Sequence, residues 1–415
     1  MIVIFFILLL FVVILQLKID VSEKKEILVV LLVILIWNLL WLVLVQAELF
    51  YKGVYTYGSD ANYYYNEFLR CLGNARPFYT AMHSRLAPLY VLFGTFILKT
   101  SPNLSSVWIK LSNILLIEVI FVLIYFWMRT YIKRTSLIIN LLFFFGLNGI
   151  ITWTVLRELK DIFFVFLVII NLSGLDYLLK KGKSLQAILF TGLMIYLQFN
   201  VRMFAVAIPL VILFIYILVW RKSIKRNLYY LYGAFVILIL LFEHKRIAWF
   251  YTGFIYYAGR FREPLTLLGS SSITQILIAP FRFLIGPGPI RALEGSEVFV
   301  VTTNMGNILI FLGSILWWII LPILFMVFVF DSKFIFRNLY FFATPIFIVL
   351  MYSIMYLGTG DTRLRATTYI LFIPAICKYL EYLVDNKPKK LVLTQYIISS
   401  MFVWFFSILL SILTT

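Results

Sequence analysis

Apolar runs of roughly helical length recur along the whole chain. A transmembrane helix needs about 20 mainly apolar residues, and on that basis the 415-residue sequence predicts an all-α polytopic membrane protein with about twelve spans. We see no linker and no repeat of fixed period, so we treat residues 1–415 as a single transmembrane domain. The predicted spans are 1–17, 27–47, 106–128, 136–152, 161–179, 185–200, 203–220, 227–242, 306–330, 338–357, 366–384 and 391–413.

Two loops on one side of the predicted bundle, 48–105 and 243–305, are much longer than the others. Each contains an apolar segment, 87–98 and 273–285, that is too short to span and is predicted to be an interfacial or re-entrant helix. The second segment runs into a Gly-Pro-Gly-Pro sequence. Non-helical backbone survives at membrane depth only inside protein or beside water, so a hydrated cavity is expected on this side.

The composition excludes a soluble domain. Hydrophobic residues make up 63% of the chain and the mean hydropathy is +1.01, whereas soluble domains are about 45–50% apolar. Residues 1–17 have neither a basic start nor a small-residue cleavage site, so we expect them to stay as a helix. The two cysteines and two histidines give no metal-ligand spacing and no disulfide framework.

Lysine and arginine are sorted between alternate loops. The short loops 18–26, 129–135, 180–184, 221–226, 331–337 and 385–390 hold 13 Lys and 5 Arg, which predicts that they are cytoplasmic. The opposite loops hold 12 Arg and 5 Lys. Orientation explains half of the basic residues behind the net charge of +18, so we expect no nucleic-acid partner.

Arginine on the outer face therefore needs another explanation. A guanidinium group binds phosphate through two parallel hydrogen bonds. The enrichment predicts an anionic, phosphate-bearing ligand handled outside the cytoplasm. The candidate residues for binding this phosphate are Arg85, Arg157, Arg202, Arg282, Arg291, Arg363 and Arg365.

The densest polar motif lies at residues 57–67 in the first long loop. If a helix begins at Ser59 or Asp60, then Asp60, Tyr63, Tyr64 and Glu67 share one face. A carboxylate there can accept a proton from an attacking hydroxyl, which is general-base catalysis. The alternative is that Ser59 or Asp60 only caps the helix.

Three outer segments place charges beside helix ends. They are 157–161, which includes Arg157 and Glu158, the segment around Arg202, and 360–365 with Arg363 and Arg365. Together they predict a pyrophosphate site gripped from several sides. The alternatives are that the charges of 157–161 pair with one another, and that single arginines extend to lipid phosphates.

Two further groups have open roles. His83 is a candidate general acid or base, or an ordinary loop residue; the same alternatives hold for His244. Glu118 lies mid-span and is expected to pair with Lys110 or with another helix. So few intramembrane carboxylates argue against an ion-coupled transporter.

The order of these features resembles bacterial membrane glycosyltransferases of the C-type (GT-C) superfamily and the related surface-polysaccharide polymerases. The resemblance covers most of the chain, with degenerate motifs: Asp60 with its tyrosines, 87–90, Arg157-Glu158, Arg202, 280–287, and Arg363-Leu364-Arg365 before a helix containing Pro374. It implies a polyprenyl-phosphate or polyprenyl-diphosphate sugar donor and a catalytic base at the acidic residue Asp60. No acidic pair flanks a single residue at Asp60, so metal-assisted members are a poor template.

The sequence thus predicts a multi-pass plasma-membrane enzyme that transfers or polymerises lipid-linked sugars onto a glycan acceptor, without metal or cofactor. Asp60, Glu67 and His83 are the catalytic candidates, and Tyr63, Tyr64 and the outer arginines bind substrate. The rivals are a flippase or exporter of lipid-linked oligosaccharide and a scaffold within a polysaccharide-synthesis complex.

Overall fold

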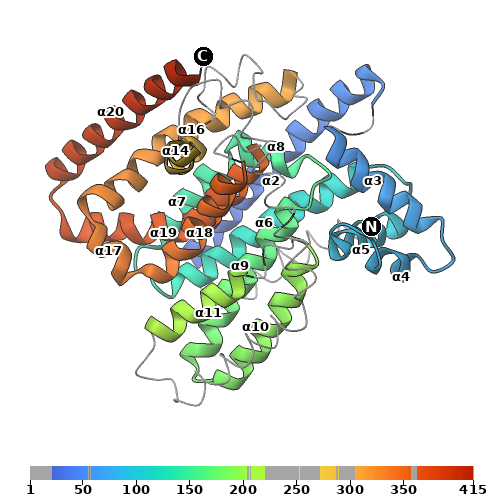
Figure 1. Cartoon of the computed structure of the whole chain (residues 1–415), viewed down its shortest axis with the longest axis horizontal. Helices are drawn as coiled ribbons and strands as arrows, with labels where there is room; N and C mark the ends of the chain where they lie inside the picture. Colours follow the sequence, from blue (N-terminus) through green and yellow to red (C-terminus); the bar gives the residue numbers. More distant parts are fainter. Residues whose placement is uncertain are drawn as a thin grey trace.

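The computed structural model describes residues 21–202 except 55 and 57, the segments 207–219, 272–286, 304–356 and 362–414, and the single residues 205, 252 and 288. Within these residues the chain is helical and contains no strand, which confirms the all-α prediction. Figure 1 shows the helices as one bundle with α3–α5 projecting from its side. They are α2 (Val21–Lys52), α3 (Gly58–Leu72), α4 (Pro77–Met82), α5 (Pro88–Thr100), α6 (Val107–Arg129), α7 (Thr135–Gly146), α8 (Gly149–Val155), α9 (Asp161–Lys180), α10 (Ser184–Phe199), α11 (Ala207–Val219), α14 (Ser272–Ile285), α16 (Asn304–Phe330), α17 (Ser332–Arg337), α18 (Leu339–Tyr356), α19 (Thr362–Asn386) and α20 (Lys389–Thr414).

Six of the described helices are long and apolar enough to cross a membrane: α2, α6, α9, α16, α19 and α20. The bent pair α7–α8 adds a seventh if it forms one span. The other predicted spans with described residues correspond to α10, α11 and α18, which are apolar but too short by the same criterion. The predicted spans 1–17 and 227–242 lie outside the described residues. The structure therefore supports a polytopic helical membrane protein, and the number twelve stays a prediction.

The predicted span 136–152 is not one continuous helix, because the chain bends by 64° between α7 and α8. Asn148 sits at the break and caps α8: its Oδ1 accepts hydrogen bonds from the backbone N–H groups of Ile150 (3.0 Å) and Ile151 (3.3 Å). Its Nδ2 donates to the carbonyl oxygen of Gly313 at 3.1 Å. Asparagine is a preferred cap, and this buried amide satisfies backbone groups on two helices.

Two glycines let α8 cross α16 at backbone contact. A Cβ atom on Gly149 would lie 2.0 Å from the carbonyl oxygen of Leu309, and one on Gly313 would lie 2.2 Å from the nitrogen of Ile150. Every residue of α8 is buried. Small residues bring helix backbones together in membranes, where packing replaces the hydrophobic effect as the driving force.

The lysine-rich loops share one end of the bundle. Ion pairs there link Glu23 with Arg129 (3.1 Å), Asp176 with Lys180 (2.9 Å), Arg134 with Asp385 (2.9 Å) and Asp331 with Lys387 (2.6 Å). The hydroxyl of Tyr131 also donates to Asp176, and Glu381 accepts from the backbone N–H of Lys133. These contacts confirm that four of the predicted cytoplasmic loops, and the N-terminal end of α2, come together. The loop 221–226 lies outside the described residues.

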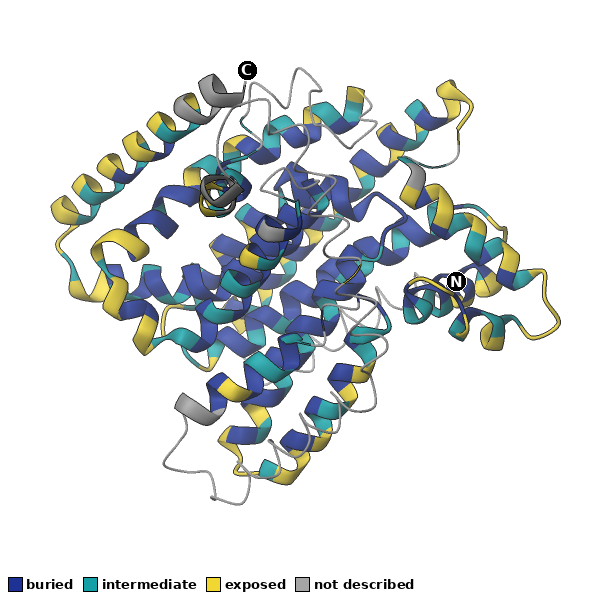
Figure 2. Ribbon diagram, viewed as in Figure 1, coloured by how far each residue is buried: buried dark blue, intermediate teal, exposed yellow. Residues whose placement is uncertain are grey.

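The opposite end carries α3–α5 and the first turns of α6, α9, α16 and α19. Glu48, near the end of α2, caps α16 by accepting from the backbone N–H groups of Asn304 (3.0 Å) and Met305 (3.1 Å). α3 packs on α5 where Gly94 leaves room for the ring of Phe68, which a Cβ would approach to 2.5 Å. Figure 2 shows buried residues concentrated in the central helices and a largely exposed α20, which is 11% buried along its apolar window.

The crossing of α8 and α16 predicts the effect of one added methyl group. Gly149→Ala would push its Cβ into the backbone of α16, so we expect a loss of about 1–3 kcal/mol in stability or more. The matched control is Gly73→Ala, whose Cβ would meet nothing closer than 3.7 Å. Thermal unfolding in detergent measures both. Equal unfolding midpoints for Gly149→Ala and Gly73→Ala would contradict the backbone contact between α8 and α16.

Candidate functional site

Helix α3 begins at Gly58, beside the guanidinium group of Arg157. Gly58 has φ +82°, which favours glycine, and a Cβ there would lie 3.3 Å from an Arg157 nitrogen. Asp60 follows in the first turn, and its carboxylate lies 2.7 Å from the guanidinium of Arg363 at the start of α19. The Asp60 side chain is 54% exposed and that of Arg363 is 20% exposed. The first long loop therefore places an accessible carboxylate beside the N-terminal end of α19.

The segment 156–160, between α8 and α9, is held in place by α6. Asn113 donates from Nδ2 to the carbonyl oxygen of Arg157 at 2.9 Å. Lys110 and Glu158 meet at 3.0 Å, and both side chains are fully buried. We expect Glu118 to pair with Lys110 or with another helix, and the first alternative is wrong because Lys110 pairs with Glu158. Among the described residues, the carboxyl oxygens of Glu118 have no hydrogen-bond partner.

Arg202, just after α10, pairs with Asp161 at the first turn of α9. Its guanidinium lies over the rings of Phe164 (5.5 Å) and Tyr352 (5.7 Å). Glu158 and Asp161 thus pair with residues of other elements and not within their own motif. Each pair fixes a cation-bearing segment against a neighbouring helix.

Arg365 ties α19 to the end of α14. Its Nε donates to the carbonyl oxygen of Phe283 at 3.2 Å, and a Cβ on Gly286 would lie 2.7 Å from its guanidinium. Trp317 and Trp318 of α16 donate to the carbonyl oxygens of the last two residues of α14, at 2.6 and 2.9 Å. The predicted short segment 273–285 is therefore a helix whose terminal carbonyl groups are satisfied by its neighbours. Arg282 is half-buried in its last turn.

Lys160 joins the same site as the last residue before α9. Its ammonium group lies 5.5 Å from the centre of the Tyr64 ring. Burial and the charges of Arg202 and Arg363 lower the pKa of Lys160 well below its ordinary value, with Asp60 opposing them. Burial likewise raises the pKa of Tyr64, against the opposing charges of Arg202 and Arg363. Four chain regions far apart in sequence, on α3, before α9, after α10 and on α19, therefore act on one another electrostatically here.

We call Arg157, Lys160, Arg202, Arg363 and Arg365 the cationic cluster. Three of its members lie at the N-terminal ends of α9 and α19, where the helix dipole also favours anions. The cluster and the Asp60 carboxylate can hold a phosphate group beside a proton acceptor. Among the described residues, no three His, Cys, Asp or Glu side chains group as metal ligands.

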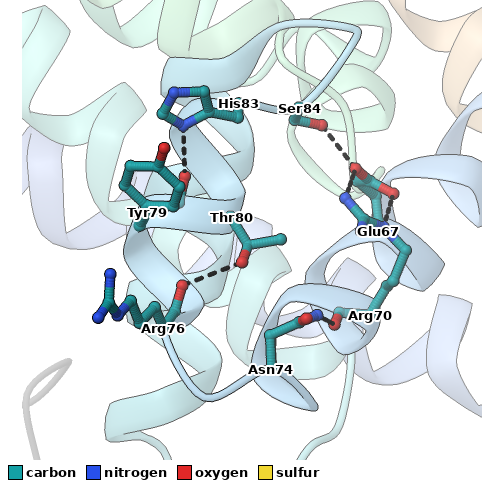
Figure 3. Close-up of polar contacts among 8 residues, drawn as sticks. All are labelled: Glu67, Arg70, Asn74, Arg76, Tyr79, Thr80, His83 and Ser84. Carbon is teal, nitrogen blue, oxygen red and sulfur yellow. Dashed lines mark hydrogen bonds and ion pairs between the residues drawn. The ribbon is translucent and has the colours of Figure 1, made fainter.

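Glu67 and His83 lie within the packing of α3 against α4, as Figure 3 shows. The Glu67 carboxylate pairs with Arg70 at 2.6 Å and accepts from the Ser84 hydroxyl at 2.6 Å. The hydrogen bonds from Arg70 lower the pKa of Glu67, while burial opposes them. The His83 ring bonds the carbonyl oxygen of Tyr79 at 2.9 Å and is exposed. These contacts lie within α3, at the end of α4, and between α3 and the segment that follows α4.

The predicted face of α3 is divided by its surroundings. Tyr64 is buried at 5% exposure, and Tyr63 is 38% exposed near Glu67, Arg70 and Arg85. Arg85 is exposed. The structure therefore brings Asp60 and Tyr64 to the cationic cluster, and Tyr63 and Arg85 lie with Glu67. Arg291 and His244 lie outside the described residues.

Sequence reasoning missed Lys160 and the supports Lys110, Asn113 and Asp161. The signal was present in the run of four charges at 157–161. The partners of these charges come from α6 and from the segment after α10, which no local pattern reveals.

Comparison with known proteins adds no relative to this geometry. No family model matches the chain, and no curated protein or solved structure matches it either. The site is therefore interpreted from its own residues.

The buried pair of Lys110 and Glu158 predicts a non-additive double-mutant cycle. Glu158→Gln or Lys110→Met alone strands a buried charge, so each should cost about 3–5 kcal/mol of stability. The double variant should cost less than the sum, because no unpaired charge remains. Thermal or denaturant unfolding of the three purified variants measures this; additive losses would show that the pair does not couple.

Proposed function

We propose that the chain is an integral-membrane glycosyltransferase or polysaccharide polymerase that uses a sugar donor linked to polyprenyl phosphate or diphosphate. The observation that carries this proposal is the meeting of one accessible carboxylate, Asp60, with Arg363 and the rest of the cationic cluster. The resemblance of the motif order to GT-C glycosyltransferases supports the same reading. We place the reaction on the extracytoplasmic face, which the lysine bias of the other end favours.

The proposed reaction follows from these groups. An acceptor hydroxyl attacks the anomeric carbon of the donor sugar, and Asp60 takes the hydroxyl proton. The new glycosidic C–O bond forms as the C–O bond to the donor phosphate breaks, and the phosphate leaves with the electron pair. We assign to Arg202 and Arg363 the stabilisation of the negative charge that develops on this leaving group.

The location suits a lipid-linked donor. The cationic cluster lies at the ends of α9 and α19, which are both long enough to span the bilayer. A phosphate bound there keeps its polyprenyl chain at the depth of the apolar spans. The polyprenyl chain would therefore lie among apolar residues while the phosphate group lies beside the cationic cluster.

The distribution of cations favours a transferase over an exporter. An exporter needs cations along a path between the two sides, so that the pyrophosphate is accompanied throughout. In the described spans α2, α6, α9, α16, α19 and α20, lysine and arginine lie toward the ends, and Lys378 bonds the carbonyl oxygen of Tyr131 at the lysine-rich end. This arrangement supports chemistry at one face.

The proposal predicts the effect of Asp60→Asn in cells lacking the native copy. Transfer should fall by about 100-fold or more, because general-base catalysis contributes 10²–10⁴-fold. Lipid-linked units should then accumulate on the outer leaflet while polymer is lost. The matched control is Asp385→Asn, a half-exposed carboxylate paired with Arg134 at the opposite end of the bundle.

Size analysis of lipid-linked glycans, with each leaflet probed separately, measures both variants at equal protein levels. Unchanged polymer in Asp60→Asn would contradict the role of Asp60. Accumulation on the inner leaflet alone would identify an exporter.

A further inference from the structure

Lys160 differs from the arginines of the cationic cluster in what holds it. Arg363 pairs with Asp60, Arg202 pairs with Asp161, and Arg365 donates to the Phe283 carbonyl. The ammonium group of Lys160 faces the ring of Tyr64, and it makes no hydrogen bond or ion pair with the described residues. It remains partly exposed.

Lys160 is also the one member of the cluster that can lose its charge, because arginine stays protonated. Each element that packs around Lys160 contributes a charged or titratable group. These groups are Asp60 and Tyr64 on α3, Arg202 after α10, Arg363 on α19, and Arg157 and Asp161 beside it in sequence. Burial and the two facing arginines lower its pKa well below the ordinary value. A protonated Lys160 beside Arg202 and Arg363 is therefore costly in free energy until a negatively charged ligand binds.

We propose that Lys160 is a ligand for the phosphate group of the bound anion and takes up a proton as that anion binds. This inference rests on the proposed function only for the phosphate-bearing nature of the ligand. Lys160 acts in binding, so it needs no sugar and no acceptor.

The direction of the pH effect follows from the two states of Lys160. The anion raises the pKa of Lys160 in the complex above its value in the free protein. Between the two values, binding draws a proton from solution. Below both, the lysine is charged throughout and no proton moves. Above both, it is neutral throughout and the contact is lost, so this part of the affinity falls as pH rises.

The test uses the full chain in detergent and farnesyl diphosphate as the probe. Calorimetric titration in buffers of different ionisation enthalpy gives the number of protons taken up per diphosphate bound. Lys160→Arg keeps the charge and removes the titration. We expect it to bind within a few-fold of wild type and to take up fewer protons at the same pH. Ionisation of the diphosphate contributes equally to both proteins and cancels.

Lys160→Met removes the charge and should weaken binding by about 10-fold or more, since a charge-assisted hydrogen bond is lost. The matched control is Lys99→Arg, an exposed lysine beside Phe78 in the α3–α5 unit. It should leave both affinity and proton uptake unchanged.

Equal proton uptake by wild type and Lys160→Arg would overturn the proposal. Unweakened binding by Lys160→Met, or no binding of the diphosphate by wild type, would overturn it too. Because the probe carries no sugar, these results are independent of the glycan analysis of Asp60→Asn. Proton-linked binding together with normal polymer in cells carrying Asp60→Asn would support the anion site and contradict the catalytic role of Asp60.

Discussion

The buried ion pair between Lys110 and Glu158 is the interaction on which the site geometry depends. Neither charge can stay in the bundle interior without the other, because desolvation of a lone ion costs several kcal/mol. The pair fixes the turn between α8 and α9 against α6. That turn sets where Arg157 meets the start of α3 and where Lys160 lies. The positions of Arg157 and Lys160 thus depend on an ion pair buried in the bundle interior.

The sequence predicted well what depends on local pattern. Apolar runs marked most described helices, and the lysine bias predicted which loops gather at one end, as the ion pairs of Arg134 and Lys387 bear out. It did not predict the break at Asn148. An asparagine in an apolar run is compatible with a continuous helix, and only the Gly313 carbonyl across the bundle makes it a cap. The number of spans stays a prediction, because α10 and α18 are apolar but shorter than the helices that can cross a membrane.

The site was predicted in its residue types and less well in its grouping. Asp60 and Glu67 share a helix face, but seven residues separate them by about 10 Å along the axis. Glu67 therefore meets Ser84 and Arg70, while Asp60 meets Arg363. Lys160 escaped attention because its neighbours come from α3, from α19 and from the segment after α10. Contacts between residues so far apart in the chain cannot be recognised from a single sequence.

The ion pair of Asp60 with Arg363 has a consequence for biogenesis. Its carboxylate belongs to the first long loop, and its guanidinium belongs to a helix near the end of the chain. At translation rates of about 5–20 residues per second, the two are made tens of seconds apart. Until α19 has inserted, the Asp60 carboxylate lacks its Arg363 partner, and the cationic cluster lacks Arg363 and Arg365. A nascent or truncated chain without α19 would therefore hold α3 in the membrane without the charge contact that joins it to the rest of the bundle.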